Sequence, residues 1–172
     1  MNAILVATII VVIVGYTVFF GAPYVPAKQK DIRQAFDDLY TISQDDTILD
    51  LGSGDGRVLR EASRRGARAV GYELHPALVA LSRWLSRHDK NVRVEFGNFW
   101  KKPFPDATTV VYVFGDGRDI AKMTRHIEHQ SIRLGHPIYV LSYGFELPGH
   151  TVQRSLGAHH LYRITPLQAN KP

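Results

Sequence analysis

Glycines at every second position follow an acidic residue in the stretch from Asp50 to Arg57. The apolar run from Thr47 to Leu51 predicts a strand leading into this loop, where glycine lets the backbone approach a ligand closely because it has no side chain. A helix is expected to follow, and then a second strand ending at Glu73, whose carboxylate can accept hydrogen bonds from both hydroxyls of a ribose. The spacing therefore predicts a site for a cofactor that contains a nucleoside.

The third glycine of the loop decides which cofactor is expected. The pyrophosphate fingerprint G-x-G-x-x-G would need glycine where Arg57 stands, whereas the third glycine is Gly56. The pattern D-x-G-x-G-x-G resembles the first motif of the class I methyltransferases that use S-adenosylmethionine. In that family the loop faces an amino acid and a sulfonium, and Asp50 can attract the methionyl ammonium. An ordinary glycine-rich turn is the alternative, which the register of Asp50, the glycines and Glu73 disfavours.

Strands and helices alternate along the rest of the chain, which predicts an α/β fold with a Rossmann-like seven-stranded class I methyltransferase sheet. Strands are expected over residues 47–51, 92–96, 109–114, 138–143, 151–156 and 160–164, in addition to the strand that ends at Glu73. The last two are expected to be antiparallel. Amphipathic helices are expected over 28–40 and 120–134. Another should begin at Pro76 and end near His88, with Leu78, Leu81 and Leu85 as its apolar positions.

The N-terminal 27 residues carry no charged side chain, and the run from Ala3 to Phe20 is almost wholly apolar. Through Ala22 this run would be about 30 Å long as a helix, enough to span a bilayer. A cleaved signal peptide is the alternative, but it would have Lys or Arg before the apolar run. We expect an uncleaved anchor, because Lys28 and Lys30 are the first cations and follow the run. By the positive-inside rule the domain then faces the cytoplasm.

The chain thus divides into three expected parts: a transmembrane anchor over residues 1–22, an extended tether over 23–27 and a methyltransferase domain over 28–172. The absence of cysteine among 172 residues excludes disulfides and thiolate metal sites. No metal site is expected from the histidines, since no carboxylate lies beside them in a ligand-like pattern. Arg57, Arg60, Arg64 and Arg65 fall on one predicted helix, and we interpret them as a solvated face rather than a nucleic-acid surface.

Further motifs narrow the resemblance. They are Pro23-Tyr24-Val25-Pro26, Tyr72-Glu73-Leu74-His75-Pro76, Asn98-Phe99-Trp100-Lys101 and Val113-Phe114-Gly115. Together with the glycine loop they resemble the membrane-anchored protein-lysine methyltransferases, whose mitochondrial members modify the c-ring protein of ATP synthase and the adenine nucleotide translocase. The chain departs from that family at Asn98, where Asp is usual, and at Asp116-Gly117, where a Val-Pro pair is usual.

The resemblance implies a lysine methyltransferase that uses S-adenosylmethionine, held at the bilayer by its N-terminal helix and acting on a membrane or membrane-proximal protein with an accessible lysine. The residues it assigns to the cofactor are Asp50, Gly52, Ser53, Gly54, Gly56, Glu73, Asn98, Phe99 and Phe114, with Tyr24 on the substrate or lid side. No catalytic acid or base is assigned, because alignment and desolvation supply most of the acceleration of methyl transfer.

Two alternatives remain. An RNA or small-molecule methyltransferase is disfavoured by the anchor and by the lack of an Asn/Asp-Pro-Pro-Tyr motif, so no nucleic-acid partner is expected. A catalytically silent cofactor-binding scaffold is the other, and the substitution at Asn98 favours it.

Overall fold

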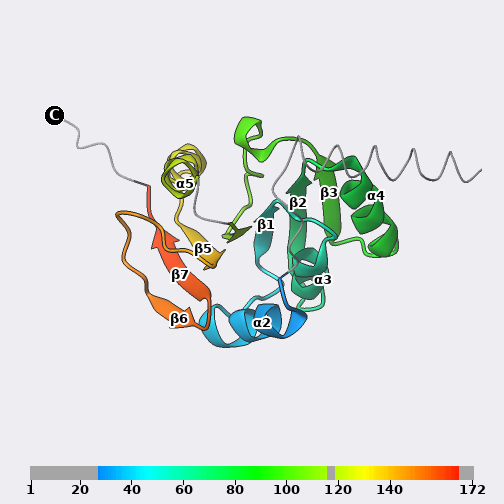
Figure 1. The fold of residues 1–172 in the computed structure, drawn as a ribbon, viewed down its shortest axis with the longest axis horizontal. Helices are drawn as coiled ribbons and strands as arrows, with labels where there is room; N and C mark the ends of the chain where they lie inside the picture. Colours follow the sequence, from blue (N-terminus) through cyan, green and yellow to red (C-terminus); the bar gives the residue numbers. More distant parts are fainter. Residues whose placement is uncertain (1–26, 116–118, 167–172) are drawn as a thin grey trace, which may run out of the picture.

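A seven-stranded sheet with helices on both faces makes up the part of the chain described by the computed structural model, residues 27–115 and 119–166 (Figure 1). The strands are β1 (Thr47–Leu51), β2 (Arg68–Glu73), β3 (Val92–Phe96), β4 (Val110–Phe114), β5 (Ile138–Tyr143), β6 (Arg154–Leu156) and β7 (His159–Ile164). Their spatial order is β3-β2-β1-β4-β5-β7-β6. The predicted Rossmann-like α/β sheet is thereby confirmed.

The first five strands are parallel, and β7 is antiparallel to both of its neighbours, β5 and β6. Strand β1 is buried along its whole length, as its apolar run requires of a central parallel strand. From β1 the chain moves outward through β2 to β3, and then returns to place β4 on the other side of β1. Ligands of such sheets bind beyond the carboxyl ends of the strands at this reversal, which is where the glycine loop follows β1.

Helices cover the two faces of the sheet with separate apolar cores. The helical segments are α2 (Gln29–Gln34), η1 (Ala35–Leu39, a π-helix), α3 (Arg57–Ser63), α4 (Pro76–Leu85), η2 (Phe99–Lys101, a 3-10 turn) and α5 (Ile120–Leu134). Ile32, Leu59 and Val79 join α2, α3 and α4 in one core, whereas Met123 and Ile127 of α5 belong to the other. Three helices therefore share the face opposite α5.

The helix expected over residues 28–40 consists of α2 and η1, and it packs on the sheet as predicted, with Ile32, Phe36 and Leu39 buried. Strand ends differ from expectation by a few residues at most: β4 begins at Val110, β6 at Arg154 and β7 at His159. Such differences are small, because the ends of strands depend on pairing rather than on local sequence.

Helix α4 ends a few residues before the expected end, and two of its predicted apolar positions are exposed. The helix ends at Leu85, and Leu81 and Leu85 are exposed while Val79 and Ser82 are buried. The reason is the close approach of α4 to the glycine loop: a Cβ atom built on Gly56 would lie only 2.1 Å from Ser82 Oγ. The side of α4 that faces the loop therefore accepts only small side chains.

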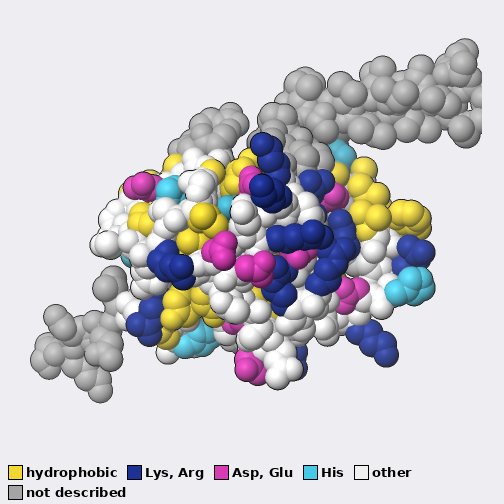
Figure 2. Space-filling model, turned by 90° about the horizontal axis from the view of Figure 1, so that it is seen from below, with side chains coloured by type: hydrophobic (Ala, Val, Ile, Leu, Met, Phe, Trp, Pro, Cys, Tyr) yellow, Lys and Arg dark blue, Asp and Glu magenta, His cyan; other side chains and the backbone are white. Residues whose placement is uncertain are grey.

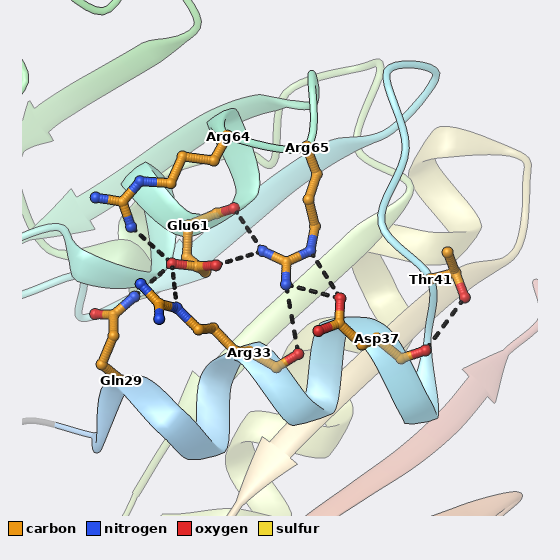
Figure 3. A network of polar contacts seen from close by, with 7 residues as sticks. All are labelled: Gln29, Arg33, Asp37, Thr41, Glu61, Arg64 and Arg65. Carbon is orange, nitrogen blue, oxygen red and sulfur yellow. Dashed lines mark hydrogen bonds and ion pairs between the residues drawn. The ribbon is translucent and has the colours of Figure 1, made fainter.

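A buried carboxylate fastens α2 to α3 (Figure 3). Glu61 accepts hydrogen bonds from Gln29, Arg33, Arg64 and Arg65, at 2.5, 3.3, 2.8 and 2.5 Å. Burial would raise the pKa of Glu61, but the hydrogen bonds from the arginines outweigh it and hold the pKa below its usual value. Because α3 ends at Ser63, Arg64 and Arg65 lie just beyond it, not on it as predicted, and they pair with Glu61.

The predicted anchor, the tether except for Ala27, Tyr24 and Asp116-Gly117 lie outside the described residues. Within residues 27–115 and 119–166, no helix has the length and apolar character needed to cross a bilayer. The same part of the chain contains no group of three or more His, Asp or Glu side chains placed to hold a metal ion.

Candidate functional site

The loop after β1 has a backbone that only glycine adopts easily. Gly52, Gly54 and Gly56 have φ angles of 87°, 54° and 77°, in the left-handed region where a Cβ atom causes strain. A Cβ atom built on Gly52 would meet nothing within 4 Å, so the space beside this residue is open. The glycines predicted from spacing thus form a turn with room for a ligand at the point where the strand order reverses.

Hydrogen bonds from the loop to β2 fix its position. The N–H groups of Gly52 and Ser53 both donate to the Tyr72 carbonyl, at 2.9 and 3.1 Å. The Glu73 carboxylate is buried and accepts from Gly54 N at 2.8 Å and from His75 N at 2.7 Å, one bond on each oxygen. Each oxygen keeps acceptor capacity beyond these bonds, which is what two ribose hydroxyls would need.

Asp50 lies on β1 beside Gly71 of β2 and is buried. Burial raises the pKa of its carboxyl well above the usual value, and the negative charges of Glu73 and Asp55 raise it further. The charged form of Asp50 is therefore held in an unfavourable environment. A cation bound next to it would restore that form, which fits the predicted attraction of an ammonium group.

Asp55 and Arg57 hold the loop in place, a role that the sequence analysis did not assign to either residue. Asp55 accepts from the backbone and the guanidinium of Arg57 and forms a further ion pair with Arg60. Burial would raise the pKa of Asp55, but the hydrogen bond and charge of Arg57 hold it below the usual value. Arg57 Nη1 also donates to the Ala27 carbonyl at 2.9 Å, which joins the loop to the first described residue. The Asp-Gly-Arg sequence was the available signal.

Ser53 faces the sheet rather than the open side of the loop. Its side chain is buried, and a Cβ atom built on Gly71 would lie 2.5 Å from Ser53 Oγ and 2.6 Å from Leu59 Cδ1. The hydroxyl therefore packs over Gly71. The position of the Ser53 side chain does not support the predicted contact of Ser53 with the cofactor. Gly71 is the residue that lets the loop lie this close to β2.

Asn98 and Phe99 follow β3, next to Glu73. Gly97 N donates to the Glu73 carbonyl at 2.9 Å, so the end of β3 is tied to the end of β2. The Asn98 side-chain oxygen caps the η2 turn by accepting from Trp100 N at 3.0 Å, and it keeps a second lone pair for another donor. The Phe99 ring stacks on Trp100 with centroids 4.7 Å apart. Both predicted residues thus lie at the same edge of the sheet as the Glu73 carboxylate.

Aromatic side chains gather at the ends of β4 and β5. Phe114, 37% exposed, has its ring centroid 5.2 Å from that of Tyr143. Tyr143 donates to Asp31 Oδ2 at 3.1 Å, which ties α2 to this group. His159 lies against Tyr143 with centroids 4.6 Å apart, and burial lowers its pKa to about 4. A neutral imidazole therefore lies beneath an aromatic surface, and only Phe114 of this group was assigned from the sequence.

The Tyr112 hydroxyl lies 3.0 Å from His159 Nε2. Burial raises the pKa of Tyr112, and the nearby Asp50 charge adds to this effect, so the phenol stays protonated and shares a hydrogen bond with the imidazole. The buried network of β4 and β7 thus reaches the neighbourhood of the glycine loop. The site has two sides: carboxylates and open backbone at β1–β3, and aromatic rings at β4 and β5.

Comparison with known proteins shows which proteins this chain is similar to. The model of a family described as the ANTKMT methyltransferase domain matches residues 50–154. The human lysine N-methyltransferase named for the c-ring protein of ATP synthase is 32% identical over 111 residues, covering 63% of this chain and 46% of the relative. A protein-lysine N-methyltransferase of Saccharolobus islandicus is 33% identical over 95 residues, covering 51% and 57% of the two chains. The chain spans about half the length of the curated relatives it matches.

A solved structure extends the likeness over more of the fold. The RNA methyltransferase from Salinibacter ruber, in complex with S-adenosylhomocysteine, has a TM-score of 0.73 and 26% sequence identity, covering 86% of this chain and 98% of that one. The family match runs from Asp50, which precedes the glycine loop, to Arg154 at the start of β6. The chain therefore belongs to the family defined by the ANTKMT methyltransferase domain.

Proposed function

We propose that the chain transfers the methyl group of S-adenosylmethionine to a lysine of a membrane or membrane-proximal protein. The observation that carries the proposal is the Glu73 carboxylate, held by Gly54 N and His75 N beside the glycine loop within the matched methyltransferase domain. The relatives named for lysine methylation of the ATP synthase c-ring protein and of the adenine nucleotide translocase support a protein substrate.

The residues present fit this cofactor. Glu73 offers two oxygens to the ribose hydroxyls, and buried Asp50 offers an anion to the methionyl ammonium. Asn98 and Phe99 lie at the neighbouring strand end, where they would meet the adenine. S-adenosylhomocysteine in the Salinibacter ruber relative supports the assignment. Gly52, with open space beside it, leaves the backbone accessible to the ligand.

The bound cofactor would supply an electrophilic methyl group on a sulfonium, and the chain has to present a neutral amine to it. Phe114 and Tyr143 offer an apolar wall, and an apolar environment disfavours the charged ammonium of lysine. The same rings attract a cation through their faces, which would hold the lysine on arrival. Alignment and exclusion of water are thus the contributions expected from this chain.

The proposal includes the expected arrangement at the bilayer: an anchor over residues 1–22, a tether over 23–27 and a cytoplasmic catalytic domain over 28–172. Its support is the uncharged run from Ala3 to Phe20 and the first cations after it. The bond from Arg57 to the Ala27 carbonyl gives further support, because it holds the end of the tether against the cofactor loop.

Deletion of residues 1–22 is the test. Cofactor affinity should stay nearly intact, while lysine methylation of a membrane preparation should fall about 10²-fold or more, since anchoring raises the effective concentration of the target. The measurements are calorimetry with S-adenosylmethionine and transfer of labelled methyl groups to membranes, with mass spectrometry to locate methyl-lysine. Glu73→Ala in the full chain serves as the variant that should lose cofactor affinity and transfer together.

The outcomes separate the alternatives. Equal methylation of membrane protein by both forms would contradict the anchored arrangement. Label found in RNA instead of protein would favour an RNA methyltransferase, an alternative that the Salinibacter ruber relative keeps open. Cofactor binding without transfer to any fraction of the extract would favour the scaffold.

A further inference from the structure

Helix α4 exposes a row of apolar side chains, which we call the α4 apolar face: Ala77, Leu81, Trp84 and Leu85. Their spacing of i, i+4, i+7 and i+8 puts them on one side of the helix. Leu81 is 42% exposed, Trp84 60% and Leu85 39%. A helix that only had to cover the sheet would turn these residues inward.

The opposite side of α4 buries polar side chains. Ser82 and Ser86 are buried, and their hydroxyls have no hydrogen-bond partner among the described residues. A buried polar group without a hydrogen-bond partner destabilises the fold. The helix therefore buries polar groups while it exposes two leucines and a tryptophan, an arrangement that a cytoplasmic surface alone does not explain.

Basic side chains border the α4 apolar face. Arg87, His88 and Lys90 lie just after the helix, and α4 itself carries no acidic residue. Asp89, between His88 and Lys90, accepts a hydrogen bond from Ser63. The Arg87 guanidinium lies 5.0 Å over the Trp84 ring. Figure 2 shows the yellow side chains at the right-hand edge, where Figure 1 places α4, next to dark blue and cyan ones. An apolar patch with a basic border complements a surface that is apolar inside and negative outside.

The position of α4 relative to the start of the described chain indicates which surface that is. Ala27 precedes α2, and α2, α3 and α4 share one face of the sheet, with α3 in contact with α2. The proposed anchor ends about five residues before Ala27. A bilayer that holds this anchor would therefore lie close to the face that carries α4.

We propose that the α4 apolar face inserts into the interfacial region of a bilayer rich in anionic phospholipids. Trp84 would lie at the headgroup level and Leu81 and Leu85 at the edge of the acyl chains, as in helices that bind in the plane of the interface. The basic border would contact the phosphates. The inference rests on the proposed anchor to bring α4 to the bilayer and is independent of the methyl acceptor.

Tryptophan quenching in reconstituted full chain tests the proposal. Trp84 and Trp100 are the two tryptophans, so Trp100→Phe leaves Trp84 as the single reporter. In vesicles of phosphatidylglycerol and phosphatidylcholine, lipids brominated near the carbonyl end of the acyl chain should quench Trp84 emission about twofold or more. Leu81→Ser with Leu85→Ser should abolish most of this quenching, and Arg87→Gln with Lys90→Gln should reduce it.

Ile132→Ser is the matched control, because Ile132 is an apolar residue, 49% exposed, on α5 at the opposite face. It should leave the quenching unchanged. Chain that floats with the vesicles while Trp84 stays unquenched would overturn the α4 inference alone. Chain that neither floats nor shows quenching would overturn the anchor as well. Quenching replaced by cross-linking of two chains through α4 would assign the face to a second copy and overturn the lipid proposal.

Discussion

At the residue scale, Asp50 and Glu73 bring two buried carboxyl groups to the same loop from neighbouring strands. Glu73 is held by backbone donors on both oxygens, whereas Asp50 is the group whose pKa burial and like charges raise. We therefore expect different roles for the two acids. Glu73 would accept hydrogen bonds from neutral hydroxyl groups, and Asp50 would pair with a positive charge.

We predict that binding of S-adenosylmethionine releases a proton from Asp50. The raised pKa means that Asp50 of the free chain takes up a proton more readily than an exposed carboxyl group, and a bound ammonium would lower that pKa. Affinity should therefore increase with pH until Asp50 is ionised in the free chain, and decrease on acidification. Calorimetry in buffers with different ionisation enthalpies measures the released protons. Asp50→Asn should bind more weakly and lose this dependence; the same proton release in the variant would assign it to another group.

The spacing of acid and glycines was sufficient to locate Asp50, Gly52, Gly54 and Glu73 around one loop, because each role depends on the local backbone. The orientation of the Ser53 side chain could not be predicted in this way. Its hydroxyl faces Gly71 of the neighbouring strand, and this contact depends on the distance between loop and sheet. Whether each assigned residue contacts the cofactor stays a prediction.

At the scale of elements, the packing of α4 against the glycine loop decides which face of that helix is buried. Helical periodicity identified α4 and its apolar positions, but it did not show that Leu81 and Leu85 are exposed. The sequence of a helix shows its apolar and polar faces, but it does not show which face packs against a closely spaced neighbouring segment. Gly56 and Ser82 make that choice here, since their contact leaves no room for a larger side chain.

Gly56→Ala should destabilise the fold by more than its backbone strain alone. The new Cβ would lie 2.1 Å from Ser82 Oγ at a φ of 77°, so strain and overlap together should cost about 2–4 kcal/mol. Gly135→Ala is the matched control, with a φ of 74° and nothing within 4 Å, and should cost about 1 kcal/mol. Urea unfolding measures both free energies.

Adding Ser82→Gly to Gly56→Ala separates the two causes. Removal of the Ser82 hydroxymethyl group should recover the overlap part of the loss and leave the strain. If the double variant were no more stable than expected from the sum of the single changes, the proposed contact between α4 and the loop would not explain which side of α4 is buried.

At the scale of the whole molecule, the alternation of strands and helices in the sequence was sufficient to predict the parallel part of the sheet. Strands β1, β3 and β5 have the expected bounds. The apolar runs of β1 and β5 are recognisable because these strands are largely buried, whereas β3 at the edge of the sheet has only Val94 buried. The division of residues 28–40 into α2 and η1 was not predicted, since periodic apolar positions indicate a helix without distinguishing a π-helical turn from an α-helix.

Global stability should depend on pH through His159. Burial lowers its pKa to about 4, so between that value and about 6.5 the unfolded chain binds the proton and the folded chain does not. Stability should be complete above about pH 6.5 and fall by about 2 kcal/mol by pH 5. His159→Gln keeps an acceptor for Tyr112 without titrating and should show a smaller fall in urea unfolding. His160→Gln is the control, and equal falls in both variants and the unchanged chain would contradict the assignment.

The strand order has a consequence for synthesis on the ribosome. Every residue assigned to the cofactor except Phe114 lies between Asp50 and Phe99, so that half of the sheet emerges first. Until β4 is made, about 60 residues after β1 and so roughly 3–12 s later, the nascent chain presents an apolar strand with one unpaired edge. The cofactor would meet most of its ligands on this unfinished half. We expect S-adenosylmethionine to favour the half-built sheet at the time when an unpaired β1 is most exposed to aggregation.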